Sequence, residues 1–392
     1  FLILEDGTVF EGTHIGADKE IISEIVFNTS MAGYLEVLTD PSYAGQAVCM
    51  TYPLIGNYGI CRDDCESERP WPDGFIVREL SRIPSNFRCD CTIQEYLEEN
   101  GVPGIAGIDT RALTKILREK GTMNGMITTN DAYDLNEVLP KLKEYTTGKV
   151  VEKVTCKEKY VVNPTTDLAQ NGPLSGAARF DKEAYEKGVR EPKPALVTEL
   201  SGQGLKVALL DLGAKRNIAR SLAERGCEVT VYPAGTPAQE IIDDNPDGIM
   251  LSNGPGDPKE CTGVIAEIKK LYDTEIPIFA ICLGHQLMAL ATGADTHKMK
   301  YGHRGGNHPV KDLMTGRVYI SSQNHGYVVD TDKLDPSVAV PAFINVNDGT
   351  NEGLSYTGKN IFTVQFHPEA CPGPQDSGYL FDRFIHMMRG EN

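Results

Sequence analysis

Residues 278–290 read IFAICLGHQLMAL, and this stretch decides how the second half of the chain folds. It begins with the unbroken apolar run of a strand buried on both faces and ends with the composition of a helix packed into a core. Cys282 stands at the junction, with the small residues Ala280 and Gly284 two places before and after it. Small residues at these positions allow a sharp strand-to-helix turn that lifts a nucleophile out of a sheet. The start of the following helix favours a thiolate at Cys282.

The sequence around this turn alternates between apolar strand patterns and amphipathic helix patterns. We expect strands at 205–213, 228–235, 248–254 and 277–284, and helices at 217–226, 238–245, 263–273 and 285–293. Strands and helices that take turns at these lengths predict an α/β fold, a parallel sheet with helices on both faces. Active sites in such sheets gather at the carboxyl ends of the strands, where Cys282 falls.

The first 150 residues predict a second domain of mixed α/β structure. Residues 1–12, FLILEDGTVFEG, place two apolar runs around an Asp-Gly pair that favours a hairpin turn. Farther along, Asp109 or Thr110 can cap a helix that Gly121 ends. From about 150 to 204, prolines and charged residues interrupt every pattern, which is typical of a connecting region. The expected domains are therefore 1–150, 151–204 and 205–392.

Composition excludes several classes of function. The net charge is −17, from 38 basic and 55 acidic residues, which argues against nucleic acid as a partner because phosphates are bound by clustered Lys and Arg. The apolar runs are too short for a membrane span. The ten cysteines are scattered without the spacing of a secreted, disulfide-bonded protein, so we expect a reducing cytoplasm.

No metal or nucleotide site is expected in this chain. Two close cysteine pairs lack further ligands to complete a site, namely Cys61 with Cys65 and Cys89 with Cys91. Three histidines lie among Lys and Gly, and we interpret their segment as a solvated loop: His297, His303 and His308. The sequence contains no GxxxxGK[ST] loop, and DLGAKRN at 211–217 lacks the GxGxxG spacing.

A second expected strand carries the partners that a cysteine nucleophile needs. Residues 361–370 read IFTVQFHPEA, and Pro368 favours an extended backbone at His367. Residues two apart in an extended chain project to the same side, so Glu369 can reach the imidazole. Cys282, His367 and Glu369 then form a nucleophile, a base and an orienting carboxylate.

The turn at 251–258, LSNGPGDP, ends another strand of the same sheet. By itself it is equally well explained as a tight connection. Beside a thiolate, however, the N–H groups of Gly254 and Leu283 could hold the oxyanion of a tetrahedral intermediate.

Four of these motifs together resemble the class I (triad) glutamine amidotransferase family: GPGDP at 254–258, ICLGHQLMAL at 281–290, SSQNHGY at 321–327 and QFHPEA at 365–370. The N-terminal half resembles the other domain of one branch, the small subunits of glutamine-hydrolysing carbamoyl-phosphate synthases. The matching stretches are MAGYLEVLTDPSYAGQ at 31–46, TYPLIGNYG at 51–59 and GIDTRALTKILREKGTMNG at 107–125.

This resemblance implies a reaction and a set of residues. Cys282 would attack the side-chain amide of L-glutamine, His367 would pass the proton to the leaving ammonia, and Glu369 would hold the imidazole. A glutamyl thioester would form and then hydrolyse to glutamate. The residues implied to line the substrate pocket are Ser42, Gly254, Gly256, Leu283, Gln286, Asn324, Gly326 and Tyr327.

The resemblance also implies a partner. A large synthetase subunit would bind ATP, Mg²⁺ and bicarbonate, and would receive ammonia through an internal passage to make carbamoyl phosphate for arginine or pyrimidine synthesis. This chain departs from the family pattern at Ala280, where glycine is usual, at Tyr327, where phenylalanine is common, and at Cys371, where serine often stands. Cys371 suggests oxidative pairing with Cys282.

Three alternatives remain open at this point. The first is the glutaminase part of GMP, anthranilate or CTP synthesis, which the N-terminal stretches disfavour. The second is a cysteine peptidase or γ-glutamyl hydrolase, disfavoured by the joint presence of QNHGY and GPGDP. The third is a catalytically silent regulatory subunit, disfavoured by the intact Cys282, His367 and Glu369.

Overall fold

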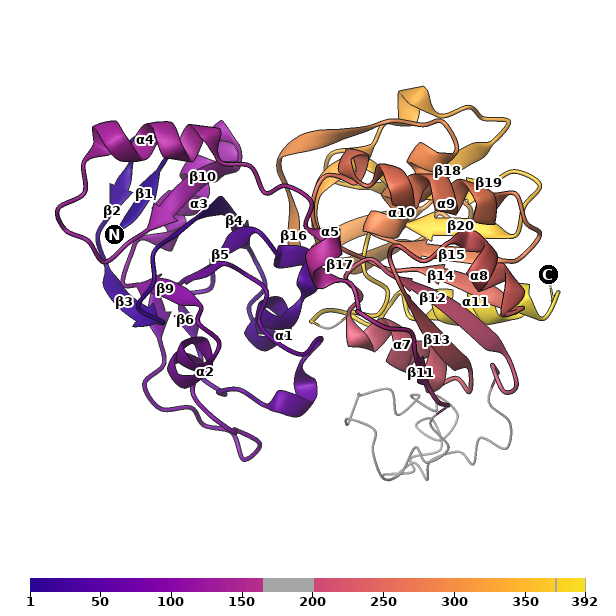
Figure 1. Cartoon of the computed structure of the whole chain (residues 1–392), viewed down its shortest axis with the longest axis horizontal. Helices are drawn as coiled ribbons and strands as arrows, with labels where there is room; N and C mark the ends of the chain where they lie inside the picture. Colours follow the sequence, from indigo (N-terminus) through magenta and orange to yellow (C-terminus); the bar gives the residue numbers. More distant parts are fainter. Residues whose placement is uncertain (165–200, 371, 392) are drawn as a thin grey trace.

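A computed structural model describes residues 1–164, 201–370 and 372–391. The chain forms two bodies side by side, the N-terminal one drawn in indigo to magenta and the C-terminal one in rose to yellow (Figure 1). The short helix α5 (Val151–Val154) lies on the chain that passes from one to the other. No helix within the described ranges is both long enough and apolar enough to cross a bilayer.

The N-terminal body is built on an eight-stranded mixed sheet in the order β2-β1-β10-β4-β5-β7-β9-β3. The strands are β1 (Leu2–Leu4), β2 (Val9–Phe10), β3 (Thr13–Gly16), β4 (Ile21–Asn28), β5 (Gln46–Met50), β7 (Gly74–Ile76), β9 (Pro103–Ala106) and β10 (Met123–Ile127), and a separate pair is formed by β6 (Leu54–Ile55) and β8 (Glu79–Leu80). Its helices are α1 (Tyr34–Thr39), α2 (Ile93–Glu99), α3 (Thr110–Lys120) and α4 (Leu135–Glu144).

Two local predictions for this body are confirmed. Strands β1 and β2 pair in antiparallel fashion with Ile3 opposite Val9, so the Asp-Gly pair does turn a hairpin. Helix α3 begins where Asp109 accepts a hydrogen bond from the Ala112 N–H, and it ends at Gly121, whose φ of 103° suits glycine.

The C-terminal body is built on a ten-stranded sheet in the order β11-β13-β12-β14-β15-β20-β19-β18-β16-β17. The strands are β11 (Tyr160–Val162), β12 (Lys206–Asp211), β13 (Glu228–Pro233), β14 (Gly248–Leu251), β15 (Ile278–Ile281), β16 (Thr296–Asp312), β17 (Val318–Val329), β18 (Ala339–Asn345), β19 (Asn351–Tyr356) and β20 (Ile361–Val364). The run from β13 to β20 is parallel, as expected, while the strands added on either side are antiparallel. The α/β fold is thus confirmed.

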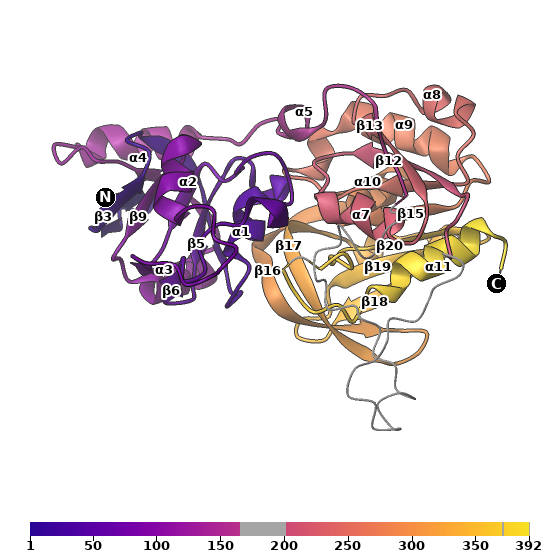
Figure 2. The ribbon, with the colours of Figure 1, turned by 90° about the horizontal axis from the view of Figure 1, so that it is seen from below.

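Helices cover both faces of this sheet (Figure 2). On one face lie α8 (Ala238–Asp243), α9 (Thr262–Tyr272) and α10 (Leu283–Ala291), and on the other lie α7 (Arg216–Ala223) and α11 (Tyr379–Met388). Side chains of a strand alternate between the two cores, so that Ala208 and Leu210 pack with the first group and Val207 and Leu209 with the second. Both faces being buried explains the unbroken apolar strands.

The long strand β16 reaches across to the N-terminal body. Lys298 pairs with Glu24 at 2.6 Å, and the backbone carbonyl of Lys300 accepts a hydrogen bond from the Thr122 N–H at 2.9 Å. The carbonyl of Arg304 likewise accepts from the Thr29 N–H. The two domains therefore share a hydrogen-bonded seam along β16.

The prediction that residues 297–308 form a solvated loop is wrong. His297, His303 and His308 all lie on β16, and the rings of His303 and His308 are 5.1 Å apart. Only His297 is mainly exposed, while His303 is buried. The error arose because β16 is polar and rich in glycine, and its strand structure is imposed by β17 and the N-terminal body rather than by its own residues.

Candidate active site

Cys282 occupies a strained turn between β15 and α10. Its φ of 52° and ψ of −104° are unusual for a residue with a side chain. Gly284 allows this turn, because a Cβ added there would lie 2.6 Å from the carbonyl oxygen of Leu251. The predicted sharp strand-to-helix turn is present, and it places Cys282 at the carboxyl end of β15.

The electrostatics of Cys282 differ from our expectation. Burial raises the pKa of its thiol, and the negative charges of Asp40 and Glu369 raise it further. Lys215 and a hydrogen bond from the Leu283 N–H oppose this rise without overcoming it. The resting cysteine is therefore a neutral thiol, and its reaction requires a base.

His367 lies close to this turn because β20 is the neighbour of β15. Ile281 pairs with Val364, and the Cys282 N–H donates to the Val364 carbonyl at 2.8 Å. The His367 Nδ1 donates to Glu369 Oε1 at 2.7 Å. Its Nε2 is buried and has no hydrogen-bond partner within the described residues. A proton on Nδ1 leaves the Nε2 lone pair available to accept one, as a general base must.

A buried cation that sequence reasoning missed completes this arrangement. Lys215 Nζ lies 2.7 Å from Glu369 Oε1. Burial by itself raises the pKa of Glu369, but Lys215 and His367 outweigh burial and bring that pKa to about 2. The carboxylate is thus charged at every physiological pH. Lys215 belongs to DLGAKRN, just after the end of β12, and that position at a strand end was the signal available in the sequence.

The turn after β14 packs closely against the start of α10. A Cβ on Gly254 would lie 2.2 Å from the Leu212 carbonyl oxygen, and Gly256 has a φ of 92°. The Gly284 N–H donates to the Ser252 carbonyl at 3.0 Å, which ties this turn to the start of α10. Glycine is therefore required at all three positions.

The predicted substrate residues meet around one cavity of about 300 Å³ between the domains. Its lining includes Cys282 and seven of the eight predicted substrate residues: Ser42, Gly254, Gly256, Gln286, Asn324, Gly326 and Tyr327. Leu283 is buried at the first position of α10 instead. His367 and Glu369 likewise do not line the cavity, and their side chains are buried.

Hydrogen bonds hold this lining in place. The Gln286 Nε2 donates to the Tyr327 carbonyl at 2.8 Å, and the Asn324 carbonyl accepts from the Cys282 thiol at 3.7 Å. The Asn324 Nδ2 donates across the domain boundary to Asp40 Oδ2 at 2.9 Å. Ser42 Oγ accepts from the Asn253 Nδ2 at 2.8 Å.

Sequence reasoning missed several charged and polar residues here. Asp40 and Asn253 join the domains, and the cavity is also lined by Glu24, Lys298 and Arg304. Asp40 directly precedes the Pro-Ser-Tyr segment that we quoted, whereas nothing in the sequence paired Glu24 with Lys298. The predicted pairing of Cys371 with Cys282 concerns a residue outside the described ranges, and Ala280 is buried within β15.

Comparisons with known proteins match both halves of the chain. The family described as "Carbamoyl-phosphate synthase small chain, CPSase domain" matches residues 2–127, and the family "Glutamine amidotransferase class-I" matches residues 208–387. The carbamoyl phosphate synthase small chain of Clostridium perfringens is 49% identical over 384 residues, which cover 98% of this chain and 98% of that protein.

A second small chain gives the same result. The carbamoyl phosphate synthase small chain of Bacillus caldolyticus is 47% identical over 392 residues, covering 100% of this chain and 97% of that protein. Among solved structures, a glutamine amidotransferase from Thermotoga maritima matches 42% of this chain and 76% of its own, with 19% identity and a TM-score of 0.35. The two small chains are the informative matches, because they align with both domains of this chain at 49% and 47% identity.

Proposed function

The chain belongs to the family of carbamoyl phosphate synthase small chains, and we propose that it hydrolyses L-glutamine through Cys282, His367 and Glu369. The observation that carries this proposal is the buried His367, whose Nδ1 is held by Glu369 at 2.7 Å and whose Nε2 is unpartnered among the described residues. His367 follows β20, Cys282 follows β15, and these two strands are neighbours in the sheet.

The reaction begins with a proton transfer. His367 Nε2 takes the thiol proton of Cys282 as the sulfur attacks the side-chain amide carbon of glutamine. The resulting oxyanion is held by the N–H groups of Gly254 and Leu283. His367 then gives its proton to the amide nitrogen, which leaves as ammonia, and a glutamyl thioester remains on Cys282.

Water completes the cycle. His367 takes a proton from a water molecule whose oxygen attacks the thioester carbonyl, and the carbon–sulfur bond breaks. The proton returns to the sulfur, and glutamate leaves. Throughout, Glu369 keeps the imidazole in one tautomer and stabilises its protonated form, as the carboxylate of a triad does.

The substrate is held by polar groups from both domains. We assign the amino and carboxylate groups of glutamine to the lining formed by Gln286, Asn324, Gly326 and Tyr327, with Ser42 approaching from the N-terminal domain. A lining of this kind rejects analogues that leave its polar groups unpaired. Gly254 and Gly256 let the backbone approach the reacting amide.

The ammonia is destined for a large synthetase subunit. Small chains of this family imply such a partner, and we propose that it binds ATP, Mg²⁺ and bicarbonate and makes carbamoyl phosphate. Ammonia released into water is mostly protonated and no longer nucleophilic, so a shielded passage to the partner serves the chemistry.

All nine cysteines in the described residues are free thiols, which suits the cytoplasm.

The test compares Cys282→Ala with Cys261→Ala, a half-buried cysteine of the same domain, in the assembly with the large subunit. We expect Cys282→Ala to lower glutamate release by more than about a thousandfold, while carbamoyl phosphate synthesis from added ammonia persists. Cys261→Ala should retain both activities. Glutamate release that survives in Cys282→Ala would refute the proposed triad.

A further inference from the structure

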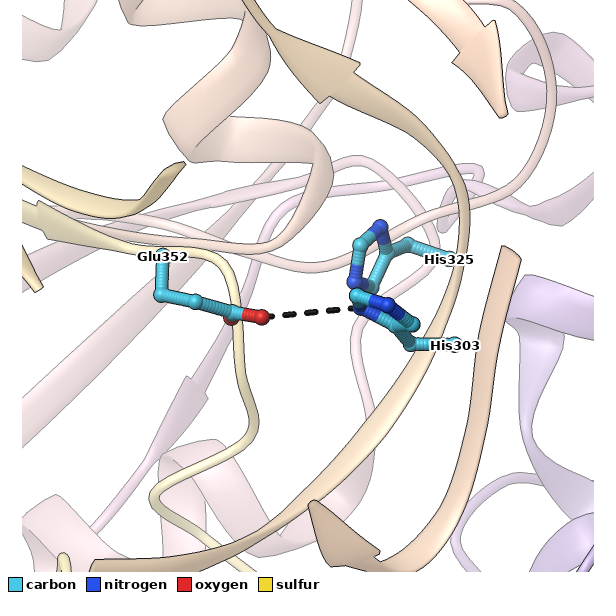
Figure 3. Close-up of side chains that lie close together, drawn as sticks. All are labelled: His303, His325 and Glu352. Atoms are coloured by element: carbon cyan, nitrogen blue, oxygen red, sulfur yellow. Dashed lines mark ion pairs between the residues drawn. The ribbon is translucent and has the colours of Figure 1, made fainter. Parts of the chain in front are cut away.

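Three buried side chains lie close together in the C-terminal body (Figure 3), and one of them, His325, also lines the cavity beside Cys282. His303 on β16 and His325 on β17 are directly opposite each other in the antiparallel pair, and Glu352 comes from β19. One possible ligand atom from each lies within 4.8 Å of the others. All three residues are buried, and Glu352 has no exposed surface. Two imidazoles and one carboxylate are a donor set typical of zinc.

One ring nitrogen of His303, Nδ1, has no hydrogen bond among the described residues and faces Glu352. Its Nε2 donates to Asp348 Oδ2 at 2.8 Å. Its Nδ1 is buried without a hydrogen bond among the described residues and lies 3.5 Å from Glu352 Oε1. An imidazole whose other N–H is held by a carboxylate has the orientation commonly found in metal-binding histidines.

His325 has a similar arrangement, with an additional mismatch. Its Nδ1 lies 2.8 Å from the Tyr327 carbonyl, and its Nε2 lies 2.9 Å from Gln323 Oε1. A neutral imidazole carries a proton on only one of these two nitrogens, and both nitrogens face oxygen atoms. If that proton is on Nδ1, the Nε2 lone pair faces an amide oxygen.

Reversing the Gln323 amide does not remove this conflict. The Gln323 Nε2 donates to Glu352 Oε1 at 2.9 Å, and after reversal an amide oxygen would face that carboxylate. A cation beside His325 Nε2 resolves the mismatch, because it attracts the lone pair and the oxygens around it.

Glu352 is likewise held by one oxygen only. Its Oε1 accepts hydrogen bonds from Gln323 Nε2 and from Asn345 Nδ2, each at 2.9 Å. Its Oε2 is buried and unpaired within the described residues. A buried carboxylate oxygen without a partner is costly, and a bound metal ion would supply that partner.

We propose that His303 Nδ1, His325 Nε2 and Glu352 Oε2 form a binding site for one zinc(II) ion, with water as the fourth ligand. Asp348, the Tyr327 carbonyl and the amides of Gln323 and Asn345 then orient the ligands. Zinc bonds of about 2.0–2.2 Å require the three ligand atoms to approach one another by roughly 1 Å or more.

The role of this ion is structural. It joins β16, β17 and β19 immediately behind the residues that we assign to glutamine binding, since His325 stands between Asn324 and Gly326. None of the three ligands lies within the proposed triad. The site is independent of the proposed function, because metal can bind whether or not the chain hydrolyses glutamine.

A proton is the competing occupant. Burial lowers the pKa of His303, but hydrogen bonds and charges from Asp348 and Glu352 outweigh burial and raise it to about 9. An imidazolium between two carboxylates would satisfy His303, but its Nδ1 would face Glu352 Oε1. Glu352 Oε2 would remain without a partner, and His325 Nε2 would still face an oxygen. Measuring the metal content of the protein distinguishes the two occupants, since zinc adds metal and a proton does not.

The experiment measures metal in the full-length, untagged chain. After exchange into chelator-treated buffer, we expect about one zinc per chain by mass spectrometry of the elements, and Co²⁺ substitution should give visible d–d absorption bands. Glu352→Gln, which keeps the size of the side chain, should bind zinc at least about tenfold more weakly, and Asp348→Asn about tenfold more weakly. His297→Asn, a mainly exposed histidine on the same strand, should bind normally.

The outcomes separate the two occupants. Zinc content that follows Glu352 and Asp348 but not His297 supports the site. Failure of the unaltered chain to bind zinc in a calorimetric titration, or equal binding by all variants, overturns it and leaves the proton as occupant. Should Glu352→Gln fail to fold, Asp348→Asn still decides the question, since the Asp348 side chain is 41% exposed.

Discussion

Lys215 Nζ lies 2.7 Å from Glu369 Oε1, and the two side chains are 3% and 0% exposed. The same carboxylate oxygen, Glu369 Oε1, accepts the hydrogen bond from His367 Nδ1 and thereby orients the imidazole. A buried carboxylate without a cation would take up a proton and lose its hold on His367. Lys215 thus acts on the proposed chemistry through Glu369, as a positioning residue.

Lys215→Met tests this relationship. Removing one member of a buried pair costs about 3–5 kcal/mol of unfolding free energy, and we expect glutamate release to fall at least about tenfold as Glu369 becomes protonated. Urea denaturation and a glutaminase assay measure the two effects. Lys259→Met is the matched control, because its pair with Asp295 is half exposed and solvent screens it, so its loss should change stability little. Equal effects in both variants would contradict the role given to Lys215.

Glu66 predicts a specific dependence of stability on pH. Burial raises the pKa of its carboxyl group to about 7, although Lys215 opposes the rise. The ordinary value is 4.5, so between pH 4.5 and 7 the folded protein binds more protons than the unfolded chain. Stability therefore falls as pH rises through this window.

Glu66→Gln should remove that part of the slope. From the two pKa values we expect the free energy of unfolding of the variant, relative to the unaltered chain, to increase by about 2 kcal/mol between pH 5 and pH 8. Chemical denaturation at both pH values measures the difference. A difference that does not change with pH would show that Glu66 ionises normally in the folded chain.

Asp40 links the N-terminal domain to Asn324, which lines the proposed substrate pocket. Its Oδ2 accepts from Asn324 Nδ2 at 2.9 Å, and a hydrogen bond to a charged acceptor is worth about 1.5–3 kcal/mol. Asp40→Asn should therefore raise the KM for glutamine about tenfold or more, with a smaller effect on kcat. Steady-state kinetics measure both constants. Asp335→Asn, in an exposed turn, should leave them unchanged.

Gly284 is predicted to tolerate no side chain. A Cβ there would lie 2.6 Å from the Leu251 carbonyl oxygen, so Gly284→Ala must displace the start of α10 at a cost of about 1–3 kcal/mol and with loss of glutaminase activity. Gly263→Ala is the control, since no atom lies within 4 Å of its Cβ position in α9. That variant should be neutral or slightly more stable by thermal denaturation. An active Gly284→Ala enzyme would refute the packing argument.

The alternation between 205 and 291 was sufficient to predict the parallel sheet, because strands buried on both faces and amphipathic helices have different apolar periods. The hairpin at residues 1–12 and the capped helix α3 were equally local, since an Asp-Gly turn and an Asp cap act within a few residues. The pairing of His367 with Glu369 was also predictable, as the two residues are only two positions apart.

The strand structure of β16 could not be predicted from local sequence patterns. Its histidines looked like a solvated loop because nothing within the segment indicates burial, yet His303 is buried against His325 of β17, Asp348 and Glu352. The same applies to Lys215 and Glu369, which are 154 positions apart, and to Asp40 and Asn324. Contacts of this kind depend on which strands become neighbours.

The sequence by itself determined the α/β class and the turn that carries Cys282, because periodicity, capping and turn chemistry are local properties, and its resemblance to a known family pointed to seven further residues that line the cavity. Tertiary structure alone decided the charges that surround the site, the seam between the domains and the cluster of His303, His325 and Glu352. Burial and electrostatic pairing arise between residues far apart in the chain, and only packing brings those residues together.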